Sequence, residues 1–262
     1  MTERAMSIIR IDHVTTSSNP GPVLRDVSLH VERGDIFGIA GHSGAGKSTL
    51  LRTINLLETP ASGSVTVAGR DLTRLSKRDL RAARQNIGMV FRHHNLLQNL
   101  TVFDNVAFPL RLHGMLNPPR LRRRVLECLE RVGLASRADE HPARLSGGQK
   151  LRVALARALA SQPEVLLCDG PASDLDAGTT RALLDILRSA HADLGVTIVI
   201  VSHDLPALGA LCNRVAVLEN GAVAETFAPA DTTAPRLTAL GRELAFYGTE
   251  GGALYHPGVL HA

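Results

Sequence analysis

Gly41–Ser48 combines residue types and a spacing that suit phosphate binding. The segment reads Gly-His-Ser-Gly-Ala-Gly-Lys-Ser, which matches the pattern G-x-x-x-x-G-K-S. Glycines let backbone N–H groups converge on phosphate oxygens, and a helix that starts at the end of the loop adds positive potential. The Lys47 ammonium group could then reach the β- and γ-phosphates of a nucleotide, and the Ser48 hydroxyl could ligate magnesium. The predicted phosphate-binding residues are Gly41, Ser43, Gly44, Gly46, Lys47, Ser48 and Thr49.

The same segment has a competing interpretation as the nucleophile elbow of a hydrolase. Gly41–Gly44 nearly fits the pattern G-x-S-x-G around Ser43, and Asp169 and His203 follow in the order that such a triad requires. However, Ala45 stands where the pattern needs its last glycine. An elbow also gives no role to the Gly-Lys-Ser that ends the segment, whereas a phosphate-binding loop explains all of it. We therefore favour the phosphate-binding loop.

A second glycine-rich segment, Leu145–Gln149, comes directly before a helix predicted over Lys150–Ala160. The first turn of a helix presents unpaired backbone N–H groups and the positive end of the helix dipole. The segment therefore predicts a second anion site on a helix N-terminus. A turn that ends a helix is the ordinary alternative when this segment is considered alone.

Two polar residues follow predicted core strands. Asp169 comes directly after the apolar run Val165–Cys168, and His203 comes shortly after Val196–Val201. A carboxylate at the end of a strand suits a magnesium ion, although a helix cap is the simpler interpretation of Asp169 alone. Considered alone, His203 is a hydrogen-bonded loop histidine.

Together, the two glycine-rich segments resemble the paired loops of the ATP-binding cassette ATPases, over about residues 8–225. The resemblance implies a P-loop core that binds ATP and Mg²⁺. It also implies that two cassettes dimerise head to tail, so that the Lys47 loop of one chain and the Ser146 loop of the other close over the same ATP. The residues that would contact this ATP from the second loop are Ser146, Gly147, Gly148 and Gln149.

The resemblance also implies roles for individual residues. Asp169 matches the carboxylate that organises Mg²⁺, together with the hydroxyl of Ser48. Asp176 matches an aspartate in the loop that spans the dimer interface. His203 matches the histidine that contacts the γ-phosphate.

Within this family, five stretches look most similar to the methionine-importer ATPases: Ile54–Glu58, Gly88–Phe91, Asn95–Leu97, Thr101–Phe103 and Val165–Asp169. This implies an ATP-binding subunit on the cytoplasmic face of the cell membrane that powers amino-acid uptake. Its partners would be a second copy of the subunit, an integral membrane permease contacted near Arg92–Leu110, and indirectly a solute-binding protein. A nucleic-acid partner is not expected. Such ATPases usually carry a further regulatory domain, for which residues 228–262 are too short.

The sequence departs from the family where hydrolysis takes place. Gly170 stands where the family has the glutamate that activates the attacking water, and loss of a general base typically costs about 10²–10⁴ in rate. Arg92 replaces the glutamine of the Q-loop, and a guanidinium cannot ligate magnesium because it has no acceptor atom. Thr15–Pro22 also lacks an aromatic residue to stack on adenine. We therefore expect ATP binding with slow or absent turnover.

Two functions stay open at this point. The first is the transport-coupled ATPase of an amino-acid importer, which the motif order favours. The second is a non-hydrolysing module that dimerises on ATP and acts as a regulator, which Gly170 and Arg92 favour.

Strand-like and helix-like segments alternate along the chain, which predicts an α/β core with mostly parallel strands, and the helical pattern of the middle region predicts a helical insertion. The resemblance also implies an antiparallel β subdomain. We expect a nucleotide-binding domain over residues 1–227, with a helical subdomain at about 92–144, and a C-terminal tail over 228–262. The helix after the first loop should bury Leu50, Leu51, Ile54 and Leu57 and end at Pro60. Val23–Val31 reads as a strand, Ser64–Ala68 as an exposed strand, and Asn220-Gly221 as a hairpin turn.

Composition excludes several other classes of protein. The 262 residues carry 21% charged residues and a net charge of +4, which is typical of a globular protein and unlike a disordered one. Aromatic residues make up only 3% of the chain, which disfavours base stacking on nucleic acid. The three cysteines form no CxxC pair, and the eleven histidines show no ligand spacing, so metal binding by histidine is not expected. Basic residues gather at Arg120 and Arg122–Arg124, either as a solvated helix face or as a docking surface.

Overall fold

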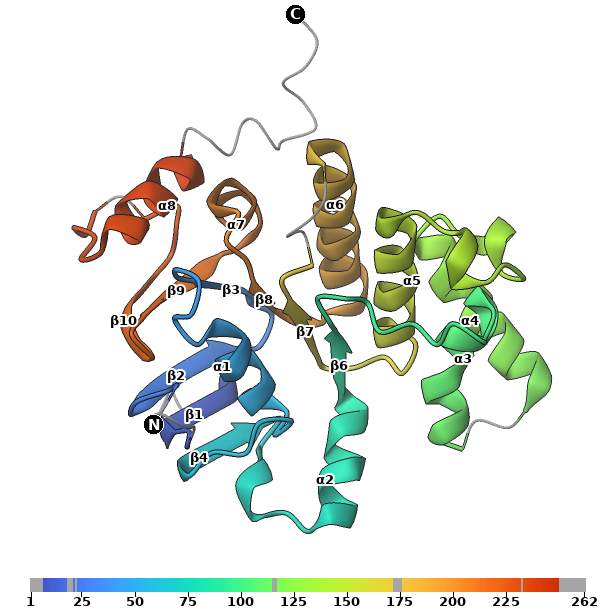
Figure 1. Cartoon of the computed structure of the whole chain (residues 1–262), viewed down its shortest axis with the longest axis horizontal. Coiled ribbons are helices and arrows are strands. Elements are labelled where there is room, and N and C mark those ends of the chain that lie inside the picture. Colours follow the sequence, from blue (N-terminus) through green and yellow to red (C-terminus); the bar gives the residue numbers. More distant parts are fainter. Residues whose placement is uncertain are drawn as a thin grey trace, which may run out of the picture. The chain divides into compact units, whose positions relative to one another are not determined.

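The computed structural model describes residues 7–17, 21, 23–114, 117–171, 176–231 and 233–249 of the chain. The chain divides into two compact units (Figure 1). The first unit combines residues 1–83 with 197–262, and the second comprises residues 84–196.

The first unit contains a four-stranded sheet in the order β2-β1-β4-β5. Its strands are β1 (Ser7–Thr15), β2 (Val27–Glu32), β4 (Ser62–Val67) and β5 (Arg70–Asp71). All three pairings are antiparallel. Buried and exposed residues alternate along β2, because one face of the sheet packs on the core.

The first unit also contains the parallel strands that carry the first glycine-rich loop. β3 (Ile36–Ala40) is buried at every residue and lies between β8 (Thr197–Val201) and β9 (Arg214–Glu219), parallel to both. β10 (Ala222–Phe227) pairs antiparallel with β9 across the predicted Asn220-Gly221 turn. The helices of this unit are α1 (Lys47–Ile54), α2 (Lys77–Ala83), α7 (Leu205–Leu211) and α8 (Ala239–Thr249), and Figure 1 shows α8 beside α7.

The second unit pairs two parallel strands and adds four helices. β6 (Ile87–Val90) runs parallel to β7 (Val165–Asp169). The helices are α3 (Val102–Leu112), α4 (Pro118–Arg131), α5 (Gly147–Leu159) and α6 (Ala177–Leu194). α3, α4 and α5 pack on one another, and α5 also packs on β6. Short 3₁₀ turns lie at Leu72–Arg74, Arg84–Asn86, Ala135–Arg137 and Pro142–Arg144.

This architecture confirms the α/β class, the parallel core strands and the separate antiparallel sheet. In the described part of the chain, no helix is long and apolar enough to cross a lipid bilayer. The domain boundaries at 144 and 227 stay a prediction.

Three local predictions were wrong. The strand expected over Val23–Val31 begins only at Val27, because the backbone before it bonds elsewhere: Arg25 N donates to Gly221 O at 2.8 Å. Helix α1 ends at Ile54 rather than at Pro60, and Leu57 is half exposed. The strand expected over Ser64–Ala68 is not exposed, since Val65 and Val67 are buried in the middle of the sheet.

The C-terminal tail contains a helix that its weak periodicity did not indicate. The Glu225 carboxylate on β10 accepts hydrogen bonds from the backbone of Leu237 and Thr238 at 3.0 and 2.9 Å, directly before α8. Leu244 is fully buried. Tertiary contacts therefore fix this helix, while residues 250–262 of the tail lie outside the described range.

Candidate functional site

The loop between β3 and α1 has a backbone that only glycine can adopt at two of its positions. Gly41 has φ +152°, and a Cβ atom there would lie 2.4 Å from the carbonyl oxygen of Leu218. Gly46 has φ +99°, and a Cβ atom there would lie 3.0 Å from the side chain of Leu24. The close contacts at Gly41 and Gly46 thus fix the path of the loop, which leads directly into the N-terminus of α1.

The Lys47 side chain folds back onto the loop that precedes it. Its Nζ atom donates hydrogen bonds to the carbonyl oxygens of Gly41 and His42, each at 2.8 Å. Gly44, at φ +81°, has open space where a side chain would be. Helix α1 begins at Lys47 with no side-chain cap, so its first backbone N–H groups keep the anion-binding character of a helix start. An ammonium group, a helix N-terminus and a glycine-rich loop together fit the phosphates of a nucleotide.

His203 follows β8 at the same edge of the sheet at which this loop follows β3. β3 and β8 are parallel, and Ile39 is in register with Val201. The carboxyl ends of the two strands therefore lie side by side, which places Gly41 and His203 at one edge of the first unit. The His203 side chain is exposed, and Asp204 directly after it caps α7.

The second unit brings three other predicted residues to one edge. Val90 of β6 is in register with Cys168 of β7, so Arg92 and Asp169 follow neighbouring strand ends. Asp169 is 1% exposed, whereas the Arg92 side chain is exposed. Gly170 has φ +57°, a left-handed conformation that L-residues with side chains avoid.

The loop after β6 is held in an unusual shape by a half-buried arginine. His94 and Asn95 both have positive φ, at 61° and 46°. Their carbonyl oxygens accept hydrogen bonds from the Arg157 guanidinium on α5, each at 2.7 Å. Burial lowers the pKa of Arg157 from its ordinary value. The sequence did not reveal this anchor, because the donor lies about 60 residues from the loop it holds.

The second glycine-rich segment starts a helix rather than ending one. Ser146 Oγ accepts from the backbone N–H of Gln149 at 3.3 Å, and Gln149 Oε1 accepts from the backbone N–H of Ser146 at 2.9 Å. This reciprocal pair is a capping box. A Cβ atom at Gly148 would lie 2.6 Å from the Thr179 methyl group, so Gly148 lets α5 and α6 approach at their N-termini.

Asp176 is the N-cap of α6, and it lies close to Gly148 at the start of α5. Its carboxylate accepts from the hydroxyl of Thr179 at 2.6 Å and from the backbone N–H of Thr179 at 2.9 Å. These bonds lower the pKa of Asp176 from its ordinary value, the hydroxyl contributing most. Gly148, Asp176 and Thr179 together line a cavity of about 270 Å³.

The three cysteines are buried and form no disulfide. Cys128, Cys168 and Cys212 are buried free thiols, and burial raises the pKa of Cys168 to about 12. Such thiols stay protonated and unreactive at neutral pH. Among the described residues, no three His, Cys, Asp or Glu side chains gather as metal ligands.

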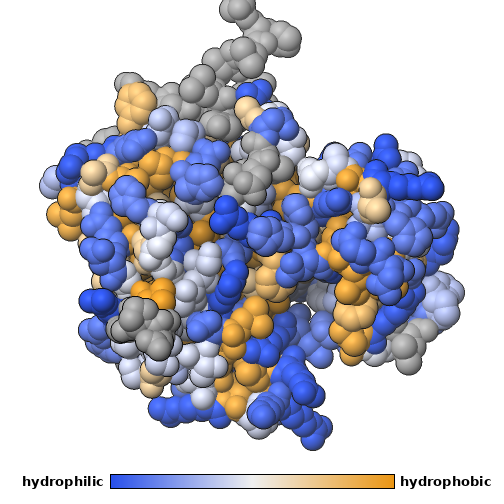
Figure 2. Space-filling view, viewed as in Figure 1, coloured by the Kyte–Doolittle hydropathy of each residue, from blue (hydrophilic) through white to orange (hydrophobic). Residues whose placement is uncertain are grey.

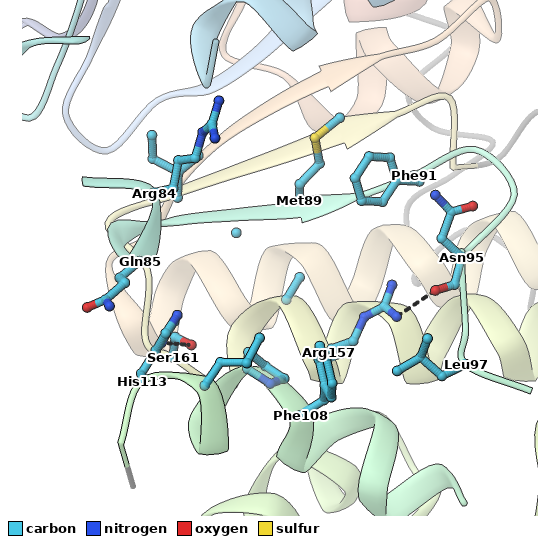
Figure 3. A pocket seen from close by; sticks show the side chains of 15 residues that line it. Arg84, Gln85, Met89, Phe91, Asn95, Leu97, Phe108, His113, Arg157 and Ser161 are labelled. Carbon is cyan, nitrogen blue, oxygen red and sulfur yellow. Dashed lines mark hydrogen bonds between the residues drawn. The ribbon is translucent and has the colours of Figure 1, made fainter. Parts of the chain in front are cut away.

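A groove of about 390 Å³ lies within the second unit (Figure 3). It is formed by β6, the loop after it, the end of α3 and the end of α5. Leu97, Phe108 and Leu112 line it and are 37, 40 and 68% exposed. Arg157 crosses its floor toward Asn95, and the His113 ring meets the Ser161 hydroxyl at one end, 3.2 Å away. The sequence signal for this groove is that Phe108 and Leu112 are apolar although they lie outside the buried face of α3.

Comparison with known proteins identifies the family. A sequence model of ABC transporters matches residues 24–173, which is more than half of the chain and includes both glycine-rich loops. The chain belongs to the ABC transporter family. This membership excludes the nucleophile-elbow interpretation of Ser43 and confirms the P-loop fold class.

Curated relatives and solved structures agree with this assignment. The methionine import ATP-binding protein MetN of Ralstonia nicotianae is 56% identical over 202 residues, 77% of this chain and 57% of that protein. MetN of Vibrio vulnificus is 50% identical over 211 residues, 78% of this chain and 61% of that protein. The chain therefore spans about three fifths of the length of these relatives.

Two solved cassettes share the fold. The ATP-binding cassette MJ0796, in a dimeric post-hydrolysis state with ADP and phosphate, is 34% identical and superposes with a TM-score of 0.78, covering 84% of this chain and 98% of that chain. CbiO1 of Clostridium perfringens, described as part of an ABC transporter complex, is 28% identical with a TM-score of 0.80, covering 92% of this chain and 99% of that chain.

Proposed function

We propose that this chain is the ATP-binding subunit of an importer for methionine or a similar amino acid. The observation that carries the proposal is the Gly41–Ser48 loop, whose Lys47 ammonium bonds back to two loop carbonyls beside an uncapped helix start. The similarity to two MetN proteins supports the solute class.

In this proposal, the backbone of the loop and Lys47 hold the triphosphate of ATP. Ser48 and Asp169 would hold Mg²⁺, which supplies charge neutralisation on the phosphates when bound. A hydroxyl and a buried carboxylate are oxygen donors of the kind that Mg²⁺ prefers, so the donor set fits. His203, at the same strand edge as Gly41, would donate to the γ-phosphate.

The Ser146 loop would act on the ATP held by a second copy of the chain. It starts a helix with its own capping box, so it keeps its conformation without help from a ligand. Gly148 and Asp176 lie together at the N-termini of α5 and α6, and both would lie at the dimer interface. The dimeric structure of the similar cassette MJ0796 supports dimer formation.

The groove of the second unit is our proposed contact with a membrane permease. It exposes Phe108 and Leu112 beside a loop that Arg157 holds firmly. Exposed apolar side chains in a concave site are typical of protein docking surfaces. The groove overlaps the predicted permease contact near Arg92–Leu110 through Asn95, Leu97, Phe108 and Pro109. Docking there would keep the subunit on the inner face of the membrane.

Hydrolysis by this copy is expected to be slow. Gly170 has no side chain to orient a water, and its left-handed backbone differs from the one a glutamate prefers. The Arg92 guanidinium, which follows the neighbouring strand β6, has only hydrogen-bond donors and cannot ligate Mg²⁺. If turnover is absent altogether, the chain is a non-hydrolysing module that dimerises on ATP, which is the second candidate function.

The proposal is tested by titrating the protein with Mg-ATP while dimer formation and phosphate release are followed together. We expect ATP-dependent dimers with little phosphate release. Lys47→Ala should weaken ATP binding by about 100-fold, because a charge-assisted contact to phosphate is lost. Lys77→Ala on α2, which removes an exposed lysine away from the loop, is the matched control. Unchanged ATP affinity in Lys47→Ala would contradict ATP binding at this loop.

A further inference from the structure

The N-terminal half of α4 carries a charge pattern that its own fold does not explain. Its first turns hold Arg120, Arg122, Arg123 and Arg124 and no acidic residue, whereas Glu127 and Glu130 lie further along. The helix dipole favours the reverse arrangement, with acidic residues first. Arg120, in the first turn, therefore opposes the dipole of the helix, and no acidic residue of that turn offsets it.

Only part of this cluster contributes to the fold. Arg124 donates to the carbonyl oxygens of Ala160 and Leu159 at 3.0 and 2.9 Å, and so caps the end of α5. Arg123 lies 3.8 Å from Glu127, and both are largely exposed. The exposed guanidinium groups of Arg120 and Arg122 have no ion-pair or hydrogen-bond partner in the described part of the chain.

The cluster adjoins one end of the groove. Arg124 binds the last turn of α5, and the next residue after that turn, Ser161, meets His113 at the end of α3. Both Ser161 and His113 line the groove, as Figure 3 shows. Leu112, the most exposed apolar residue of the groove, comes directly before His113. Basic and apolar surface thus meet at this end of the unit, and polar and apolar side chains mix over this region in Figure 2.

We propose that Arg120, Arg122 and Arg123 bind the anionic surface of a lipid bilayer. The inference rests on the proposed function, because a subunit docked to a permease by the adjoining groove would hold these arginines near the membrane. Guanidinium groups pair well with lipid phosphates, and each basic side chain near an anionic leaflet adds to the attraction. Nucleic acid is disfavoured because 3% aromatic residues leave little to stack on bases.

The test is co-sedimentation of the full chain with vesicles, without permease or ATP. Phosphatidylcholine vesicles with about one third phosphatidylglycerol should bind the chain, and vesicles of phosphatidylcholine alone should not. Added salt should release it, because the attraction is electrostatic. Arg120→Gln with Arg122→Gln should weaken binding by about tenfold or more.

A matched control removes two exposed arginines from another helix. Arg78→Gln with Arg81→Gln on α2 changes the net charge equally and should leave vesicle binding unchanged. An equal loss in both variants would show a general charge effect and overturn the proposal. Equal binding to neutral and anionic vesicles, no binding to either, or tighter binding to RNA than to anionic vesicles would also overturn it.

A second measurement separates membrane binding from a role in folding. Arg120→Glu with Arg122→Glu should abolish vesicle binding and keep or raise the Tm, since acidic residues favour the start of a helix. A structural role for the arginines predicts a lower Tm instead. Both variants should bind ATP like the unmodified chain, so failure of this inference is distinguishable from failure of the proposed ATP site.

Discussion

The two strand edges of this cassette differ in the chemistry that we propose for them. At the edge of the first unit, between β3 and β8, lies the glycine-rich loop proposed to bind phosphate, and Lys47 is hydrogen-bonded to two of its carbonyl oxygens. At the edge of the second unit, between β6 and β7, Asp169 is buried, and we propose that Gly170 and Arg92 stand where the family has groups that act on water and metal.

Under the proposed function, ATP binding and ATP hydrolysis depend on different features of this fold. Binding depends on backbone geometry that steric contacts enforce, as at Gly41 and Gly46. In our proposal, hydrolysis depends on a few side chains at the ends of β6 and β7, which pair in regular register. We therefore expect this cassette to bind ATP while turning it over slowly.

The largest expected effect comes from restoring the second edge. Gly170→Glu combined with Arg92→Gln should raise ATP hydrolysis by about 10²–10⁴-fold, because a general base is regained. Steady-state phosphate release in Mg-ATP measures it. Gly170→Ala with Arg92→Gln is the control, since it carries the same backbone strain at φ +57° without a base. Turnover of about 1 per second or faster in the unmodified chain would contradict the comparison.

A smaller effect is expected from disturbing the first edge. Gly41→Ala should destabilise the protein by about 2–4 kcal/mol, because its Cβ would meet the Leu218 carbonyl oxygen at 2.4 Å. Gly44→Ala should cost only about 1 kcal/mol, since its positive φ is strained but the space beside it is open. Urea unfolding of the two variants compares them. Similar losses would show that the close contact at Gly41 does not enforce the loop.

The smallest effect concerns the cap of α6 in the second unit. Hydrogen bonds from Thr179 hold the pKa of Asp176 below its ordinary value in the folded state. The charged carboxylate therefore stabilises the fold above its unfolded pKa of about 3.9, and this contribution is lost as pH falls through the lower folded pKa. The Tm of the unmodified chain should exceed that of Asp176→Asn near about pH 6, and the difference should vanish in acid.

Asp231 provides a matched comparison in the first unit. Thr233 lowers its pKa in the same way, again through a hydroxyl first and a backbone N–H second. Asp231→Asn should give a Tm difference with the same pH dependence, although no predicted site residue adjoins it. A difference in Tm for Asp176→Asn that does not change with pH would show that its charge plays no part in the cap.

Local patterns determined a large part of this protein from sequence alone. The spacing of Gly41–Ser48 and of Ser146–Gln149 fixes loop-to-helix transitions within a few residues, so both were predicted correctly. The Asn220-Gly221 turn was predicted for the same reason, since both residues adopt positive φ, at 50° and 79°.

Contacts between distant segments were decided only by the tertiary structure. Arg157 holds the loop at His94 and Asn95, Glu225 organises the start of α8, and Gly221 takes the bond that keeps Arg25 out of β2. The groove arises only where β6, α3 and α5 meet. No periodicity encodes such features, because their stabilising partners lie 12 to almost 200 residues away in the chain. Residue spacing thus determined the kind of ligand predicted for this chain, and tertiary packing determined which surfaces are available to partner molecules.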